Sequence, residues 1–345
     1  MPNELNEAWS RLVTIVPVSG LVFSDDIKQE IKIDRVTFMS ISRLQRIRKN
    51  IGLVKKVSEL KKQSTFSTLL ESDSIAVVYG VEKTPKDQEK TAIHEVKQAL
   101  KILSSSQLTW SRRKSNALFS IGNRSPDGNK SISFNRDDGS YHFSTNIDGR
   151  FKKLVVDKRW VQHHKQLYFF QLLELKVSKK IKKKWLDLIW RAAILMGESQ
   201  SSNIIHDAFL KNIIVLETLL VAPNEKIGEH INKRMAAFLD WTHQWEENRY
   251  PKIIERLYKI RGDYVHQGLY ESITIEDLLL SDTIVLNAMS NIVKNIDVFN
   301  SQEKLVELTE RLSAAQRLGL PVKKFRPKNL QFLEPKYSDK DFFTS

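Results

Sequence analysis

The chain has 345 residues, 41% of them hydrophobic, which is enough to bury a core and to form two domains. It has no cysteine, which excludes disulfides, cysteine-based metal sites and cysteine nucleophiles. Its net charge of +14 favours attraction to phosphate backbones or acidic partners, although many basic proteins bind no polyanion. No run approaches the roughly 20 uncharged apolar residues of a transmembrane helix, so we expect no membrane association. Acidic residues precede any apolar run after Met1, so we expect no signal or transit peptide and a cytoplasmic location.

Residues 1–158 mix strand and helix patterns, which predicts a small mixed α/β domain. Alternation at residues 31–34 and a β-branched apolar run at residues 74–80 indicate strands. Apolar residues at intervals of three and four between residues 93 and 103 indicate an amphipathic helix.

An antiparallel hairpin is expected near the end of this domain. Residues 131–134 and 141–145 have strand character, and they flank a loop with Asp138 followed by Gly139. Elsewhere in this half, Trp110 beside Arg113 could stack a base, but a tryptophan in this context is more often part of the core. His163 and His164 are adjacent and point to different faces, so they make a poor metal pair.

Residues 159–180 are predicted to connect the two domains, and a basic run begins at their end. Such a run is most often a solvated helix face, and an RNA-binding surface is the alternative. The lysines of this run are Lys179, Lys180, Lys182, Lys183 and Lys184.

From residue 181 onward the hydrophobic spacing is helical, and short connections predict an antiparallel bundle through residue 300. Gly197 and the polar residues after it are expected to end the first helix, and Gly268 another. Thr274 and Asp277 have the spacing of a capping box. The helices expected are 181–196, 205–220, 225–245, 251–267, 274–296 and 301–318. Residues 301–345 form the last helix and a tail with few core signals.

One segment of the bundle carries a recognisable signature. Arg261, four intervening residues and His266 stand toward the end of a predicted helix. This arrangement resembles the Arg and His signature of HEPN domains. Upstream, Glu217 within Leu-Glu-Thr-Leu-Leu, the Glu-Lys-Ile beginning at Glu225 and the Arg-Met-Ala-Ala beginning at Arg234 resemble the helices that precede it in the Apea-like HEPN branch.

The resemblance covers roughly residues 204–299 and implies a fold and an activity. The expected fold class is an α+β two-domain chain, with an N-terminal mixed α/β domain and a C-terminal all-α HEPN-like helical bundle. The expected activity is metal-independent endoribonuclease cleavage with no cofactor. HEPN enzymes of this kind serve in bacterial antiviral defence, abortive infection or as toxins, so the N-terminal domain would be a sensor or would position the RNA.

The chemistry of the two residue types agrees with this activity. RNA carries its own nucleophile, the 2′-hydroxyl, so cleavage needs a proton acceptor, a proton donor and positive charge on the phosphorus centre. Histidine as a residue type suits proton transfer near neutral pH, and arginine grips two phosphate oxygens at once. We therefore expect Arg261 and His266 to carry catalysis.

Helical geometry predicts that one chain makes an incomplete site. Residues five apart in a helix are separated by about 140° around the axis and roughly 7.5 Å along it, so Arg261 and His266 do not share a narrow face. HEPN dimers are understood to build a composite site from two copies, and we expect a homodimer. The alternative is that both side chains only pair with acidic neighbours and cap helix ends.

Three further residues are expected to support the site. Asp263 follows Gly262, where the family often has a polar residue directly after the Arg. Glu217 is expected to be buried and paired with either Arg234 or Arg261, in a structural role. Two other functions stay open: a non-catalytic HEPN module that binds RNA through its basic surface, and an interaction protein held silent or triggered by a partner protein.

Overall fold

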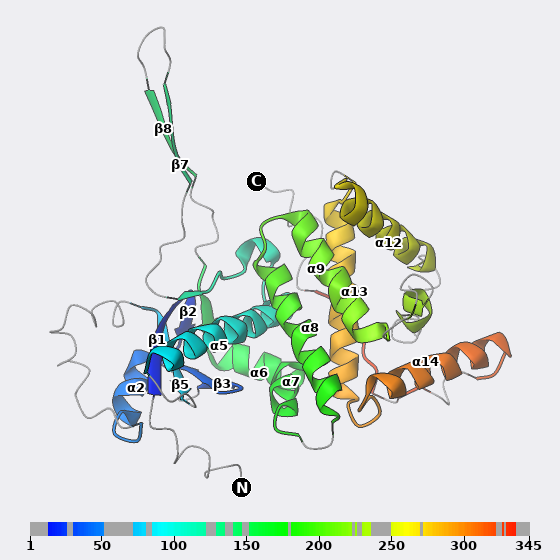
Figure 1. Ribbon diagram of the computed structural model, residues 1–345, viewed down its shortest axis with the longest axis horizontal. Helices are drawn as coiled ribbons and strands as arrows, with labels where there is room; N and C mark the ends of the chain where they lie inside the picture. The colour runs from blue at the N-terminus through cyan, green and yellow to red at the C-terminus, as the bar shows by residue number, and fades with distance from the viewer. Residues whose placement is uncertain are drawn as a thin grey trace. The chain divides into compact units, whose positions relative to one another are not determined.

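The computed structural model describes residues 13–25, 30–51, 72–80, 85–121, 129–134, 141–146, 152–178, 181–222, 225, 230–235, 250–269, 272–321, 326–327 and 329–335. The described chain is α+β, with a five-stranded antiparallel sheet near the N-terminus and a mostly helical C-terminal region (Figure 1). It divides into two compact units. The first comprises Met1–Ala99 and Lys114–Trp160, and the second Leu100–Arg113 and Val161–Ser345.

The sheet of the first unit is antiparallel throughout. Its strand order is β3 (Ile31–Ile33), β4 (Val36–Met39), β5 (Ser74–Tyr79), β1 (Val13–Ser19) and β6 (Ser120–Ile121). β5 is central, and its residues are buried on both faces. The two strands predicted at residues 31–34 and 74–80 are therefore confirmed.

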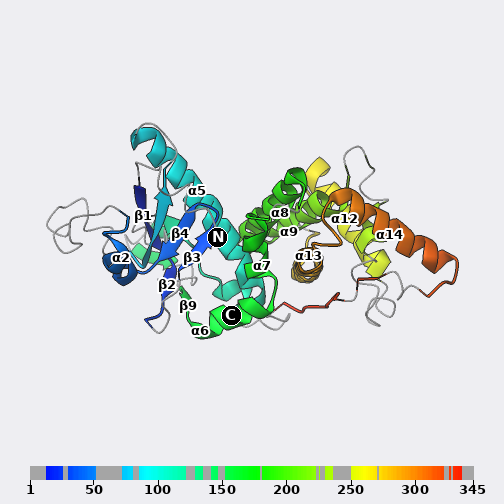
Figure 2. The same cartoon turned by 90° about the horizontal axis from the view of Figure 1, so that it is seen from below.

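Helices cover this sheet because each presents an apolar stripe to it. α2 (Ile41–Ile47) starts at the N-cap Ser40 and buries Leu44 against Ile75 and Val77. α5 (Pro85–Ser105) contains the amphipathic pattern predicted from sequence and runs along the sheet (Figures 1 and 2). An ion pair between Arg35 and Glu95 ties α5 to the β3–β4 turn.

The described part of the first unit also holds two smaller sheets. β2 (Leu21–Phe23) pairs in parallel with β9 (Leu154–Val156). β7 (Asn129–Phe134) pairs antiparallel with β8 (Tyr141–Asn146), which confirms the predicted hairpin. This hairpin forms a sheet of its own rather than an extension of the larger one.

Helices make up the second unit. Among the described residues they are the end of α5, most of α6 (Lys158–Gln166), α7 (Phe169–Leu175), α8 (Lys183–Ser201), α9 (Ile205–Leu220), α12 (Tyr250–Gln267), α13 (Ile275–Lys294) and α14 (Gln302–Arg317). α9 is central, since it contacts α8, α12, α13 and α14. α13 begins with the predicted capping box of Thr274 and Asp277 and is buried along nearly its whole length. Among the described residues, no helix has the length and apolar character needed to cross a membrane.

The division of the chain differs from the one predicted. Residues 159–180, expected as a connecting element, hold α6 and α7, because Trp160, Phe169 and Leu172 are fully buried. Leu100–Arg113, expected within the N-terminal domain, belongs to the second unit. The helix expected at residues 225–245 lies mostly outside the described residues, although residues 230–235 are helical.

α8 ends within the polar stretch expected to end it, but it continues through Gly197 first. The helix continues to Ser201, and Gly197 lies so close to α5 that an added Cβ would stand 1.6 Å from the Lys101 carbonyl oxygen. The glycine therefore permits close packing of the two helices. A sequence pattern alone does not distinguish a glycine that allows close packing from one that ends a helix.

The tail after α14 is more firmly attached than its sequence suggests. The side-chain amide of Asn291 on α13 donates to the Gln331 carbonyl and accepts from the Gln331 amide, at 3.1 and 2.9 Å. Asn287, one turn earlier, donates to and accepts from Leu333 in the same way, at 2.8 Å each. The two asparagines thus hold an extended segment against α13.

Candidate active site

α12 presents both residues of the predicted catalytic pair. Ile254, Leu257 and Ile260 form the buried face of this helix. The helix ends at Gly268, which has a φ of 71° and donates its amide to the Tyr264 carbonyl at 3.0 Å. A left-handed glycine at this position closes the last turn, as predicted, and leaves His266 in it.

Arg261 lies on the side of α12 that faces α9, where it meets Glu217. Nη2 of Arg261 stands 3.3 Å from Oε1 and 3.4 Å from Oε2 of Glu217. Of the two partners considered from sequence, the structure thus pairs Glu217 with Arg261. Burial raises the pKa of the Glu217 carboxyl, and the guanidinium opposes that rise.

This pair leaves hydrogen-bonding capacity unused. Within the described chain, Nε of Arg261 and Oε1 of Glu217 are buried and make no hydrogen bond, and neither does the hydroxyl of Tyr258. Burial raises the pKa of Tyr258 well above its ordinary value, and the nearby Glu217 adds to the rise, so this hydroxyl stays protonated. The Arg261 side chain is still 23% exposed. The free Nε is itself buried, but the 23% exposure of the side chain leaves part of Arg261 open to an anion from solvent.

His266 lies apart from Arg261. It is exposed, and no hydrogen bond or ion pair joins it to Arg261 in the described chain. This agrees with the 140° separation expected for residues five apart on a helix. A single chain therefore does not bring the two side chains together.

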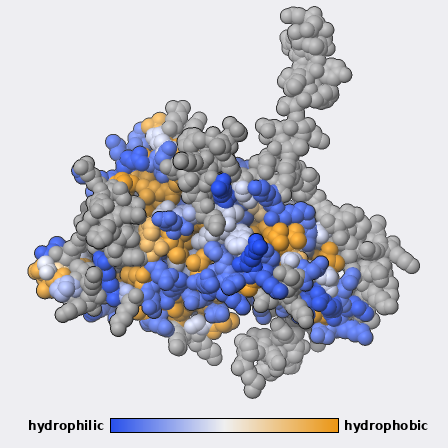
Figure 3. Space-filling model, turned by 180° about the vertical axis from the view of Figure 1, so that it is seen from behind, coloured by the Kyte–Doolittle hydropathy of each residue, from blue (hydrophilic) through white to orange (hydrophobic). Residues whose placement is uncertain are grey.

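Exposed apolar residues lie beside His266. Val265 is 47% exposed and Leu269 is 53% exposed, and a Cβ at Gly262 would meet nothing within 4 Å. Ile204, just before α9, is 48% exposed. The end of α12 thus offers an uncovered apolar surface next to the histidine. Figure 3, which draws the opposite side of the molecule from Figure 1, shows that hydrophobic patches there also alternate with hydrophilic ones.

Asp263 and Arg234 do not join the Arg261 pair. The Asp263 side chain makes no hydrogen bond or ion pair within the described residues. Arg234 is 1% exposed, forms two hydrogen bonds of 2.5 and 2.6 Å to Glu225, and donates to the Leu220 carbonyl at 2.5 Å. Those hydrogen bonds lower the pKa of Glu225 to about 2. Arg234 therefore ties the end of α9 to the segment after it.

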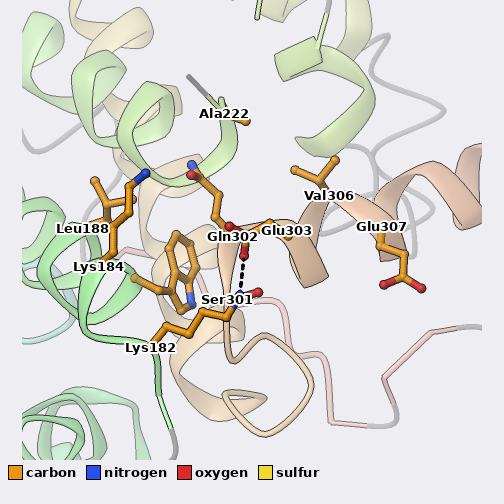
Figure 4. Close-up of a pocket in the computed structure, with 10 residues that line it drawn as sticks. Lys182, Lys184, Leu188, Ala222, Ser301, Gln302, Glu303, Val306 and Glu307 are labelled. Atoms are coloured by element: carbon orange, nitrogen blue, oxygen red, sulfur yellow. Dashed lines mark hydrogen bonds and ion pairs between the residues drawn. The ribbon is translucent and has the colours of Figure 1, made fainter. Parts of the chain in front are cut away.

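Only part of the predicted basic run lies within the described residues. Lys179 and Lys180 lie outside the described residues, and Lys182, Lys183 and Lys184 are exposed. Lys182 and Lys184 line a pocket of about 330 Å³ between α8 and α14 (Figure 4). The buried Trp185 is part of the same lining. Lys182 pairs with Glu303 at 3.4 Å, so part of the charge here is neutralised. The pocket contains neither Arg261 nor His266.

A group of residues that the sequence did not single out lies beside the Arg261 pair. The Tyr264 hydroxyl donates to Oδ1 of Asp207 at 3.3 Å. Nε2 of His206 stands 3.8 Å from the same oxygen, and the rings of His206 and Tyr264 meet edge to face with centroids 5.3 Å apart. His206 and Asp207 belong to the first turn of α9, and only the position of Tyr264 within the signature could have drawn attention to it.

A second group that the sequence did not single out is a buried ion pair. Arg113, named from sequence only as a neighbour of Trp110, forms two 2.8 Å hydrogen bonds to Asp282 of α13. It also donates to the Ser199 carbonyl and hydroxyl at 2.6 and 2.8 Å. At 3% exposure it cannot reach a substrate.

No group of three or more histidine and acidic side chains within the described residues is arranged to hold a metal ion. Comparison with known proteins found no match among family profiles, curated proteins or solved structures.

Proposed function

We propose that this protein is a metal-independent endoribonuclease of the HEPN type, in which Arg261 binds the scissile phosphate and His266 transfers protons. One observation carries the proposal. Arg261 is held by Glu217 through a single Nη atom while its side chain stays 23% exposed, and His266 is exposed at the end of the same helix. A group held in place but not saturated is suited to gripping an anion.

The reaction uses the 2′-hydroxyl of the RNA. A histidine imidazole takes the 2′-hydroxyl proton as the 2′-oxygen forms a bond to phosphorus, and the bond from phosphorus to the 5′-oxygen breaks. A second, protonated imidazole gives its proton to that 5′-oxygen. Arg261 stabilises the charge on the non-bridging oxygens. The products are a 2′,3′-cyclic phosphate end and a 5′-hydroxyl end.

Two histidines and an adjacent arginine require two copies of the chain. The exposed surface of Gly262, Val265 and Leu269 is where a second α12 would pack, since apolar side chains there have no cover in one chain. Packing across a twofold axis would place His266 of each copy toward Arg261 of the other. We therefore propose a homodimer of HEPN-like helical units as the active form.

The cellular role follows from this activity. An RNase of this kind would act in bacterial antiviral defence or as a toxin that arrests growth in abortive infection, in the cytoplasm where its RNA substrate lies. The first unit would sense the trigger or position the RNA, and a partner protein would neutralise or release the activity.

The test is cleavage of total RNA by the purified full chain in the presence of a chelator. His266→Ala and Arg261→Ala should each lower the rate at least about 100-fold, the range expected for loss of a general acid–base or of a charge-stabilising donor. The exposed His94→Ala and Glu255→Ala variants serve as controls and should retain full activity. Cleavage at the wild-type rate by either α12 variant would end the proposal.

A non-catalytic RNA-binding HEPN module is the second candidate. It is favoured by the exposure of Lys183 and Lys184, neither of which has an ion-pair partner within the described chain. In that case the two alanine changes in α12 would leave RNA binding intact and no cleavage would occur. Charge reversal at Lys183 and Lys184 would instead weaken binding, and affinity would fall steeply with salt.

A further inference from the structure

The His206, Asp207 and Tyr264 group lies directly beside the proposed phosphate site. Tyr264 follows Arg261 by three positions, so the two side chains are neighbours on the α9-facing side of α12, with Cβ atoms about 5–6 Å apart. Arg261 meets α9 at Glu217, and Tyr264 meets it at Asp207. A nucleotide whose phosphate is bound by Arg261 therefore has its base within reach of this group.

These three residues are not sealed into the core. The side chains of His206 and Asp207 are 29% and 41% exposed, and Tyr264 is partly exposed as well. The hydrogen bond of 3.3 Å from Tyr264 to Oδ1 of Asp207 is long, and it takes up only one of the roughly four acceptor positions of the carboxylate. Burial raises the pKa of Tyr264 and Asp207 raises it further, which keeps the hydroxyl a donor.

The chemistry of the group matches a nucleobase. Unstacked RNA bases are commonly bound by stacking on aromatic side chains and by hydrogen bonds to the Watson–Crick edge. Tyr264 and His206 meet edge to face at an interplanar angle of 69°, so a flat base can stack on only one of the two rings, and Tyr264, three residues after Arg261, is the ring nearer to the proposed phosphate site. A carboxylate only accepts hydrogen bonds. Guanine is the base whose Watson–Crick edge offers two adjacent donors, N1–H and the N2 amino group.

We propose that His206, Asp207 and Tyr264 form a guanine-binding subsite next to Arg261, so that the enzyme prefers to cut RNA at a phosphate flanked by guanine. This inference rests on the proposed ribonuclease activity and adds the base specificity of that same site. In it, the Tyr264 ring stacks on the base, and His206 packs edge to face against Tyr264 and orients that ring. Asp207 accepts from the two donors of the base through the oxygen atoms that Tyr264 leaves available.

The experiment uses DNA oligonucleotides that contain a single ribonucleotide, so that only one phosphate can be attacked by a 2′-hydroxyl. The base on each side of that phosphate is varied among all four. The wild-type full chain should cut the best guanine substrate with a kcat/KM about 10- to 100-fold above that of the uracil substrate, the range expected for one bidentate contact.

Three variants test the subsite. Asp207→Asn should remove the guanine preference and leave cleavage of the uracil substrate within about threefold of wild type. Tyr264→Ala should raise KM for all four bases by removing the stacking surface, whereas Tyr264→Phe should retain stacking. Asp187→Asn, an exposed helical carboxylate on α8, is the matched control and should leave the preference unchanged. If Asp207→Asn fails to fold by circular dichroism, Asp207→Ser replaces it, with the same loss of preference expected.

The outcomes separate this inference from the proposed function. Cleavage by wild type with no base preference, or a guanine preference that survives in Asp207→Asn, overturns the subsite and leaves the nuclease standing. If wild type cuts nothing, affinities for the all-DNA versions of the same oligonucleotides decide. Tighter binding of guanine that is lost in Asp207→Asn supports the subsite without the nuclease, and equal binding of all four bases overturns both.

Discussion

The second unit holds two arginine–carboxylate pairs that are built in opposite ways. Arg113 and Asp282 are 4% and 1% exposed, and Arg113 makes four hydrogen bonds of 2.6 to 2.8 Å. Arg261 and Glu217 are 23% and 15% exposed, their closest approach is 3.3 Å, and Nε of Arg261 donates nothing within the described chain. The first pair has no capacity left for a ligand. The second does, which is why the proposed chemistry belongs to it.

The glycines near these pairs follow the same division. Gly197, two residues before the Ser199 that binds Arg113, packs directly on the Lys101 backbone. Gly262, next to Arg261, faces open space. α8 is thus tightly packed at Gly197 and hydrogen-bonded to Arg113 at Ser199, whereas α12 exposes part of Arg261 and the surface at Gly262. Substitutions can test whether the residues around α8 serve stability and those on α12 serve function.

The largest effect is expected at the buried pair. Asp282→Ala should lower the free energy of unfolding by about 3–5 kcal/mol, because it strands the buried Arg113 guanidinium without its counter-charge. Glu217→Ala should cost about 1 kcal/mol or less, since Arg261 can turn to solvent. Urea unfolding measures both. Comparable losses in the two variants would show that the pairs do not differ as described. An Arg113→Leu/Asp282→Leu double variant should regain most of the stability lost by Asp282→Ala.

The packed interior should also be sensitive to acid through His164. This residue is 1% exposed, and burial lowers its pKa to about 3 from an ordinary 6.5, with a contribution from His163. Below about pH 6.5 the unfolded chain therefore binds a proton at His164 that the folded chain does not bind until about pH 3. The free energy of unfolding falls as the pH is lowered through this window. The loss attributable to His164 approaches about 4 kcal/mol.

The measurement is the free energy of unfolding between pH 7 and pH 4. His164→Phe should remove part of the pH dependence, while the exposed His94→Gln should leave it unchanged. Identical slopes for wild type and His164→Phe would show that this imidazole is already protonated in the folded protein or that it is not enclosed.

Sequence patterns correctly predicted features that depend on residues close together in the chain. The β7–β8 hairpin, the Thr274 capping box and the end of α12 at Gly268 are set by residues a few positions apart, and all three are present. The pairing of Arg113 with Asp282 joins positions 169 apart, and that of Tyr264 with Asp207 joins positions 57 apart. Contacts at such separations depend on how the helices cross. The spacing of residues along a single helix does not determine that crossing.

Gly197 shows a different limit of sequence patterns. A glycine followed by polar residues is typical of a helix end, and here it marks a close approach between helices instead. Gly197→Ala should destabilise the protein by about 3 kcal/mol, since the new Cβ would overlap the Lys101 carbonyl and force the helices apart. Thermal unfolding measures the loss. A neutral or stabilising outcome would mean that α5 and α8 separate at little cost.

The smallest effect is expected at Gly262, and it has opposite signs in the monomer and the proposed dimer. Because a Cβ there meets nothing within 4 Å, Gly262→Ala should raise the stability of the dilute, monomeric chain by about 1 kcal/mol through its greater helix preference. If a second α12 packs on this surface, the same methyl group lies in the interface and should raise the dissociation constant of the dimer. Unfolding at low concentration and sedimentation over a concentration series separate the two. Higher stability together with unchanged association would place the dimer contact elsewhere, and α12 would then present His266 to the RNA without a partner's Arg261 beside it.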